Sequence, residues 1–310
     1  MSSSTSASSS TSEKPAARGA SPGLGAVSPT AAARLAGLVR LTHPFPSLLD
    51  GGAALAIALI AGARPLDALR LGAAMVALQA AIGTVNDLVD VPRDAGRKPG
   101  KPIPAGLVGA TGATLLALVA AAVGLLLSLP SGLPTGVVAV AILGVGLLYD
   151  LWLRGTAWSW LPFALGIPLL PVYAWLGATG RVPELFLVLI PTAFISGAGL
   201  AIANALADVE RDADAGVRSV ARGLGPAGAW TAHAMLQATV VAVALASLLG
   251  VGAGIPMLIG AAGATAVLLA GVSLSRNGSS RARERGWELE AVGTALLAAV
   301  WIAAVAPVAG

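Results

Sequence analysis

The sequence contains no cysteine and few charged residues. Asp, Glu, Lys and Arg make up 11% of its 310 residues, whereas a soluble domain typically has about 25%. This scarcity argues against an ordinary soluble enzyme. The absence of cysteine excludes a disulfide framework and a cysteine-based metal site, and it leaves the redox compartment undetermined. The net charge is only +4, so we expect no nucleic-acid partner.

Apolar residues, by contrast, make up 56% of the chain, and its mean hydropathy is +0.83. A membrane-spanning helix needs about 20 mostly apolar residues. Segments of that kind occur nine times, at residues 44–62, 67–89, 107–129, 134–153, 159–179, 184–207, 226–250, 254–274 and 287–308. We therefore predict an all-α polytopic membrane protein with nine transmembrane helices, in contact with membrane lipid.

The N-terminal segment differs in composition from the rest of the chain. Residues 1–30 are rich in Ser, Ala, Gly and Pro and lack the apolar stretch of a signal peptide, which predicts a disordered tail. Residues 31–41 combine Leu and Ala with two arginines, a pattern typical of a short interfacial helix. We predict that residues 31–310 form a single transmembrane domain.

The basic residues predict the orientation in the membrane. With nine spans, sixteen of the nineteen Lys and Arg residues fall on the side of the N-terminus, and only Arg64, Arg70 and Arg181 fall on the other. Because basic loops remain in the cytoplasm, the N-terminus and the loops after the even-numbered spans are expected to be cytoplasmic.

Acidic residues cluster where the second and sixth predicted spans reach that side. The two segments are NDLVDVPRD, from residue 86, and NALADVERD, from residue 204, and they agree at six of nine positions. This similarity indicates a weak parallel internal repeat. If both helices continue, helical spacing places Asp87, Asp90 and Asp94 on one face. Asn204, Asp208 and Asp212 share a face in the same way, whereas Glu210 and Asp214 point elsewhere.

Such clusters of carboxylates predict a cation site. Carboxylates on one face repel each other, and a divalent cation relieves the repulsion. Mg²⁺ binds one or two carboxylates together with phosphate oxygens and water. Basic residues that could hold a diphosphate follow both motifs in the sequence: Arg97, Lys98, Lys101, Arg218 and Arg222. Ordinary loop charges would explain any single acid, but they do not explain a duplicated motif at matching helix ends.

At these residues the chain resembles the UbiA superfamily of intramembrane prenyltransferases, over about residues 35–308. The family signature N-D-x-x-D-x-x-x-D is matched by Asn86, Asp87, Asp90 and Asp94, and residues 96–106 are similar to its basic continuation. The second signature, D-x-x-D-x-x-x-D followed by G-(I/V)-R-(S/T), is matched by Asp208, Asp212 and residues 216–219. Ala205 stands where its first Asp usually lies, with Asn204 as a partial substitute.

The resemblance implies nine helices around a central cavity that opens laterally to lipid. It implies a prenyl diphosphate bound through Mg²⁺, with two ions bridging the diphosphate, and ionised to an allylic carbocation. A lipophilic acceptor, usually an aromatic compound or quinone precursor, would capture this cation. The implied metal ligands, which are also the catalytic residues, are Asp87, Asp90, Asp94, Asp208 and Asp212. The expected substrate-binding residues are Asn86, Arg97, Lys98, Lys101, Tyr149, Arg154, Asn204, Arg218 and Arg222.

Further polar residues of the spans have open interpretations. Asp50 lies about 9 Å into the first span, where a carboxylate is a candidate for catalysis by deprotonation or metal binding. Its alternative is a neutral acid that is hydrogen-bonded within the bundle. Tyr149, Asp150 and Arg154 either contact the diphosphate or acceptor or anchor the interface. Gln79 either lines the cavity or packs in the bundle. The two histidines, His43 and His233, are expected to have packing or interfacial roles.

Two other functions are compatible with acidic membrane motifs. An ion-coupled secondary transporter usually has its sites near the membrane midplane, whereas these acids lie at helix ends. A CDP-alcohol phosphotransferase would also be Asp-rich and Mg²⁺-dependent. Its D-G-x-x-A-R opening is absent, because Asp50-Gly51 is followed by Gly-Ala-Ala-Leu.

Overall fold

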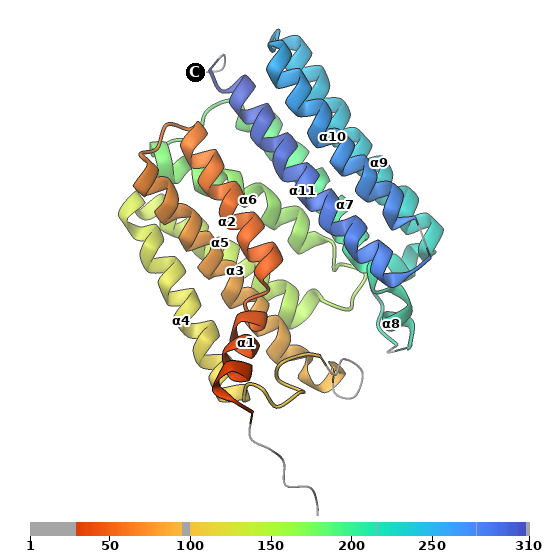
Figure 1. Ribbon diagram of the computed structural model, residues 1–310. Coiled ribbons are helices and arrows are strands. Elements are labelled where there is room, and N and C mark those ends of the chain that lie inside the picture. The colour runs from red at the N-terminus through yellow and green to blue at the C-terminus, as the bar shows by residue number, and fades with distance from the viewer. Residues whose placement is uncertain (1–28, 95–99, 215, 277, 308–310) are drawn as a thin grey trace, which may run out of the picture.

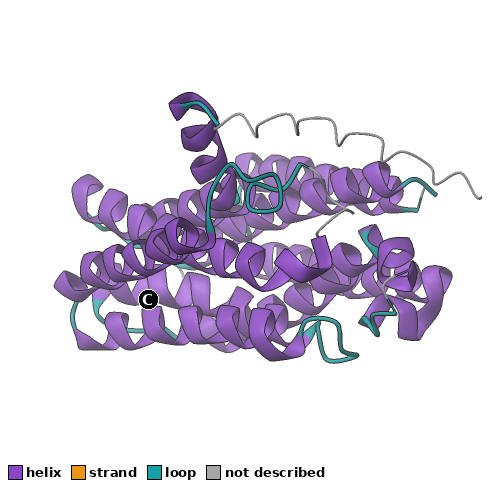
Figure 2. Ribbon diagram, turned by 90° about the horizontal axis from the view of Figure 1, so that it is seen from below, coloured by secondary structure: helices purple, strands orange, loops and turns teal. Residues whose placement is uncertain are grey.

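The computed structural model describes residues 29–94, 100–214, 216–276 and 278–307, without the side chains of residues 93 and 94. These ranges contain helices and connecting loops but no strand (Figure 2). The helices are α1 (Ala31–Leu41), α2 (Pro44–Ile60), α3 (Pro65–Asp94), α4 (Ala110–Ser128), η1 (Leu129–Ser131), α5 (Leu133–Leu148), η2 (Tyr149–Leu153), α6 (Leu161–Thr179), α7 (Phe186–Ala207), α8 (Val209–Asp214), α9 (Val220–Gly250), α10 (Ile255–Ser275) and α11 (Ser280–Val305).

Within the described ranges, eight helices are long and apolar enough to cross a membrane. α1 and α2 pass the same test together, with a bend of 54° between them, so the count is nine if this pair forms one span. The predicted all-α polytopic fold is therefore confirmed, and α1 coincides with the predicted interfacial helix. The predicted tail lies almost entirely outside the described residues, and its disorder stays a prediction.

Glycines with positive φ lie between helices at positions that also separate the predicted spans. Gly180, with φ of 73°, follows the last residue of α6, and Gly132, with φ of 96°, precedes α5. Residues with a side chain rarely adopt such positive φ values, whereas glycine does so without steric cost. The apolar runs are thereby divided into separate helices.

The helices pack in two groups, with α2–α6 on one side of the bundle and α7, α9, α10 and α11 on the other (Figure 1). The main core cluster includes Leu71, Met75 and Tyr173 from the first group and Leu297 and Trp301 from the second. This shared core holds the two groups together, so their facing sides enclose the region between them.

α10 and α11 are in close backbone contact. A Cβ atom at Gly271 would lie 2.7 Å from the backbone nitrogen of Glu290, so only hydrogen fits at this position. Small residues permit such an approach between membrane helices, which otherwise lack a hydrophobic driving force for association. The pair forms a tight hairpin whose connecting turn lies next to α8.

The two acidic motifs lie at the same end of the bundle, with α1 and α8 nearby (Figure 1). α3 continues through Pro92 to Asp94, which confirms the helical extension expected for the first motif. The continuous helix expected for the second motif is wrong, because α7 ends at Ala207 and α8 begins at Val209. The Ser280 hydroxyl donates to the Ala207 carbonyl oxygen at 2.8 Å, so a neighbouring helix satisfies this carbonyl at the break.

Candidate functional site

A cavity of about 990 Å³ lies where the two acidic motifs meet. The residues of the motifs that line it are Asn86, Asp90, Asn204, Ala205, Ala207, Asp208, Arg211 and Asp212, and Asp214 just after the second motif also lines it. The two motifs, which are 118 positions apart in the sequence, therefore line the same cavity. Asp214 was expected to point elsewhere, and that expectation is wrong, because the break at Asp208 changes the direction of the chain.

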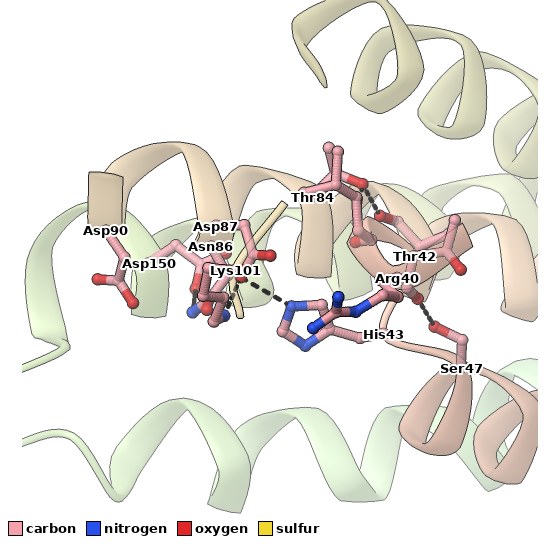
Figure 3. Close-up of polar contacts among 12 residues, drawn as sticks. Arg40, Thr42, His43, Ser47, Thr84, Asn86, Asp87, Asp90, Lys101 and Asp150 are labelled. Atoms are coloured by element: carbon pink, nitrogen blue, oxygen red, sulfur yellow. Dashed lines mark hydrogen bonds and ion pairs between the residues drawn. The ribbon is translucent and has the colours of Figure 1, made fainter. Parts of the chain in front are cut away.

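Asp87 of the first motif is held by two basic side chains (Figure 3). His43 Nε2 lies 3.0 Å from Asp87 Oδ1, and Lys101 Nζ forms an ion pair with the same oxygen. Asp87 is only 5% exposed, whereas His43 and Lys101 line the cavity in front of it. The structure therefore brings the predicted residue Lys101 to the motif and adds His43, for which sequence reasoning expected a packing or interfacial role.

His43 lies at the break between α1 and α2 in an unusual backbone conformation. Its φ of 47° makes it the only non-glycine residue with positive φ among the described residues. Its ring packs against Gly83, where a Cβ would come within 2.9 Å of His43 Cγ. The sequence feature that could have drawn attention to His43 is the His-Pro pair directly after the interfacial helix. The contact with Asp87, however, depends on the 54° bend, which sequence periodicity does not reveal.

The short helix η2 and Arg154, which directly follows it, contact Asp90 and Asn86 of the first motif. Arg154 Nη1 lies 2.5 Å from Asp90 Oδ2, and Asn86 Nδ2 donates to Asp150 Oδ1 at 2.7 Å. Asp90 and Asp150 are 2% and 3% exposed, so both carboxyl groups are buried beside the cavity. Asp150 Oδ2 has no hydrogen-bond partner among the described residues. Tyr149, Asp150 and Arg154 all line the cavity, so this segment faces the site.

The second motif is held in place by α11. Arg283, 5% exposed, forms an ion pair with Glu210 of α8, one turn along α11 from the Ser280 bond to Ala207. Within the motif, Arg211 pairs with Asp208. Sequence reasoning made no assignment to Ser280 or Arg283, because each lies 73 positions along the chain from the residue that it contacts.

Some predicted residues lie away from the cavity or outside the description. Arg218 is exposed, and its backbone N–H donates to the Gly155 carbonyl at 3.2 Å. Arg222 is also exposed and donates to the Val217 carbonyl at 2.6 Å. Neither arginine lines the cavity as described. Arg97, Lys98 and the side chain of Asp94 lie outside the described residues.

Asp50 occupies a deeper position in the same cavity. It accepts a hydrogen bond from Gln79 Nε2 at 2.6 Å through Oδ2, and both side chains line the cavity. Gln79 therefore faces the cavity, in agreement with one of its two interpretations. Next to Asp50 lies a smaller apolar chamber of about 130 Å³, which shares Asp50, Ile167 and Leu170 with the main cavity.

The carboxylates of the cavity fit a Mg²⁺ ion that is bound together with a second molecule. Among the described residues, no three His, Asp or Glu side chains come close enough to hold a metal by themselves. Both motifs instead supply hard oxygen donors to one large cavity, and Asp150 Oδ2 is buried with no hydrogen-bond partner in the part of the chain that the structure describes. Mg²⁺ suits this arrangement, because it takes few protein carboxylates and completes its shell with phosphate oxygens and water.

Several solved structures share this fold. A UbiA homolog from Aeropyrum pernix K1 aligns over 83% of this chain and 96% of its own, with a TM-score of 0.69 and 19% identity. A UbiA homolog from Archaeoglobus fulgidus, bound to DMAPP and Mg²⁺, aligns over 85% and 98%, with a TM-score of 0.65 and 19% identity. A digeranylgeranylglyceryl phosphate synthase structure aligns over 88% and 99%, with a TM-score of 0.65 and 18% identity. At these identities the similarity shows the fold alone.

The sequence itself gives a family assignment that does not depend on the fold. No curated protein matches the chain significantly. The UbiA prenyltransferase family, however, matches residues 51–292, which include both acidic motifs and most of the helices around the cavity. Sequence and fold therefore agree, and the chain belongs to the UbiA prenyltransferase family.

Proposed function

We propose that the protein transfers a prenyl group from a prenyl diphosphate to a lipophilic aromatic or quinone-precursor acceptor in a Mg²⁺-dependent reaction within the membrane. The convergence of the two acidic motifs on one cavity carries this proposal. The family assignment supports prenyl transfer in general. Two structures of a UbiA homolog from Archaeoglobus fulgidus, one bound to DMAPP and Mg²⁺ and one bound to GPP and Mg²⁺, support the same substrate class and metal for this chain.

The motif carboxylates are the proposed metal ligands. They are Asp87, Asp90, Asp94, Asp208 and Asp212, and we propose that they hold two ions. When bound, Mg²⁺ offsets the negative charge that develops on the leaving diphosphate. Lys101, Arg154 and Arg211 line the cavity beside these acids, so their N–H groups are placed to donate to diphosphate oxygens.

Apolar side chains protect the reacting carbon below the motifs. Ile82, Ile142, Val145, Ile167 and Leu170 line the cavity. Such a wall excludes water, which would otherwise capture the allylic cation in place of the acceptor. Tyr149 lies at the level of the motifs, where its ring packs edge-on against Phe163 at 5.5 Å between centroids. We assign Tyr149, Asn86 and Asn204 to orientation of the bound substrate.

The experiment is a transfer assay with purified protein, Mg²⁺, a panel of prenyl diphosphates and aromatic acceptors, which detects pyrophosphate and prenylated product. Asp87→Ala and Asp208→Ala should each lower turnover more than about 100-fold, because loss of even an indirect partner of a metal costs 10–100-fold. Asp67→Ala is the matched control, since Asp67 pairs with Arg64 and Arg70 outside the cavity. Full activity in both motif variants would overturn the proposal.

We also propose that the N-terminus and the acidic motifs face the cytoplasm, which the distribution of Lys and Arg supports. Because the chain has no cysteine, single substitutions test this directly. In intact cells, a membrane-impermeant maleimide should label Arg181→Cys and leave Arg281→Cys unlabelled until the cells are opened. The reverse pattern would contradict the proposed orientation.

The alternative functions gain little from the structure. Transporter sites usually lie near the midplane on broken helices, whereas the break between α7 and α8 lies at the end of the bundle. A transporter would also release no pyrophosphate in the assay above. The CDP-alcohol phosphotransferase interpretation still lacks its sequence signature.

A further inference from the structure

Two carboxyl groups along the cavity accept hydrogen bonds from amide side chains of α3. Asn86 donates to Asp150 at 2.7 Å, and Gln79 donates to Asp50 at 2.6 Å. Gln79 and Asn86 are seven residues apart, so they lie about 10 Å apart along the helix axis. Asp50 is therefore deeper in the bundle than the acidic motifs, at the junction of the main cavity with the apolar chamber.

Charged side chains are distributed unevenly between the main cavity and the apolar chamber. The basic residues that line the cavity all pair with acids of the motifs, and they are His43, Lys101, Arg154 and Arg211. Asp50, by contrast, is the only ionisable residue among those described as lining the apolar chamber. An acceptor that carries a carboxylate would bring its charge into this apolar chamber, where no lining Lys, Arg or His is described that could offset it.

The chamber also contains polar atoms that lack partners. Gln79 occupies one Asp50 oxygen, whereas the other, Oδ1, accepts no hydrogen bond from the described residues. The buried Oγ of Ser196 and Oγ1 of Thr294, which both line the chamber, have no hydrogen-bond partner among these residues either. Buried polar groups in proteins are nearly always hydrogen-bonded. The chamber therefore suits a molecule with oxygen atoms better than a purely hydrocarbon one.

On the basis of the proposed prenyl transfer, we propose that Asp50 binds the acceptor and that the acceptor is a neutral hydroxylated molecule, such as a phenol, and not an aromatic acid. Its hydroxyl group donates a hydrogen bond to Asp50 Oδ1. Gln79 holds the carboxylate in place through Oδ2. An aromatic ring spans the remaining distance towards the motifs, which places its nucleophilic atom near the reacting carbon.

In this reaction Asp50 acts as the general base. The allylic C–O bond breaks, and its electron pair leaves with the diphosphate. An electron pair of the acceptor forms the new bond to the prenyl carbon, and the hydroxyl proton moves to Asp50. Because the hydroxyl oxygen stays at Asp50, the attack goes through a ring carbon. In a second step the hydrogen on that carbon is lost as a proton and the oxygen regains its proton from Asp50, so one proton is released overall.

The test compares two acceptors that differ in charge, methyl 4-hydroxybenzoate and 4-hydroxybenzoate, at neutral pH with geranyl diphosphate and Mg²⁺. Wild-type protein should favour the neutral ester at least tenfold in kcat/KM. Asp50→Asn should lower turnover of the ester about 100-fold, as loss of a general base does, and should reduce the preference to below threefold. Asp67→Asn is the matched control, because Asp67 is in an ion pair outside the cavity.

Binding provides a readout that does not need turnover. Affinities of both acceptors are measured with the unreactive geranyl S-thiolodiphosphate bound, and the melting temperature checks folding of each variant. Asp50→Asn should bind geranyl S-thiolodiphosphate normally and the carboxylate acceptor more tightly than wild type does. A wild-type preference for 4-hydroxybenzoate, or an unchanged preference in Asp50→Asn, would overturn the inference.

These outcomes are distinct from failure of the proposed function. If transfer depends on Mg²⁺, Asp87 and Asp208 but not on Asp50, the proposed function stands and the inference fails. If no prenyl diphosphate binds and no pyrophosphate is released, the proposed function fails, and the role of Asp50 as a base fails with it.

Discussion

His43 allows a stability test that separates a side-chain contact from backbone strain. Its Nε2 lies 3.0 Å from the buried carboxylate of Asp87, and its φ is 47°. A hydrogen bond to a charged group contributes about 1.5–3 kcal/mol. Because the His43 side chain is 29% exposed and Lys101 also pairs with Asp87, we take the lower end of this range. Left-handed backbone at a residue with a Cβ costs about 1–2 kcal/mol.

These terms predict an order of stability for three variants. His43→Ala loses the contact and keeps the strain, so its free energy of unfolding should fall by about 1.5 kcal/mol. His43→Gly loses the same contact but removes the strain, so it should be about 1 kcal/mol more stable than His43→Ala. His43→Asn should lie closest to wild type, because Asn tolerates this conformation and retains a polar side chain.

The assay is reversible unfolding in mixed micelles, followed by tryptophan fluorescence. The matched control is the neighbouring Thr42, whose φ of −74° is ordinary. At that position Ala should be at least as stable as Gly, which is the opposite order. A His43→Gly variant no more stable than His43→Ala would refute the strain argument, and an unchanged stability in His43→Ala would refute the contact.

Three further predictions concern packing, the second motif and the metal. Gly197→Ala should lower the free energy of unfolding by about 1–3 kcal/mol, because its Cβ would lie 2.8 Å from the backbone carbon of Phe163; unchanged chemical denaturation would contradict this. Arg283→Ala should release α8 and weaken geranyl diphosphate binding, measured by calorimetry, whereas Arg281→Ala should not. EDTA should abolish pyrophosphate release, and Mg²⁺ should restore it; full release in EDTA would exclude a metal requirement.

Sequence reasoning identified the acidic motifs because repetition at helix ends is visible without coordinates. Helical continuation was correct for α3, which extends through Pro92 to Asp94. It was wrong for the second motif, where α7 stops at Ala207. The difference has a physical cause that is remote in sequence, since the Ser280 hydroxyl from α11 satisfies the Ala207 carbonyl.

Residues that act through bends or distant contacts could not be found in this way. His43 reaches Asp87 because α1 and α2 are bent by 54° at their junction. Arg154 was recognised as a candidate, but its contact with Asp90 joins residues 64 positions apart. Asp50 was visible as an intramembrane carboxylate. Its partner Gln79, and its place beside the apolar chamber, required the packing of α2 against α3.

Low charge and long apolar runs by themselves determined the membrane fold, because a backbone in lipid satisfies its hydrogen bonds within helices. The duplicated motif predicted the class of chemistry, because clustered carboxylate oxygens are ligands that Mg²⁺ prefers. Only the tertiary structure decided which carboxylates share a cavity and which bases pair with them. These relations depend on how helices far apart in sequence cross and bend, and local periodicity carries no information about such contacts.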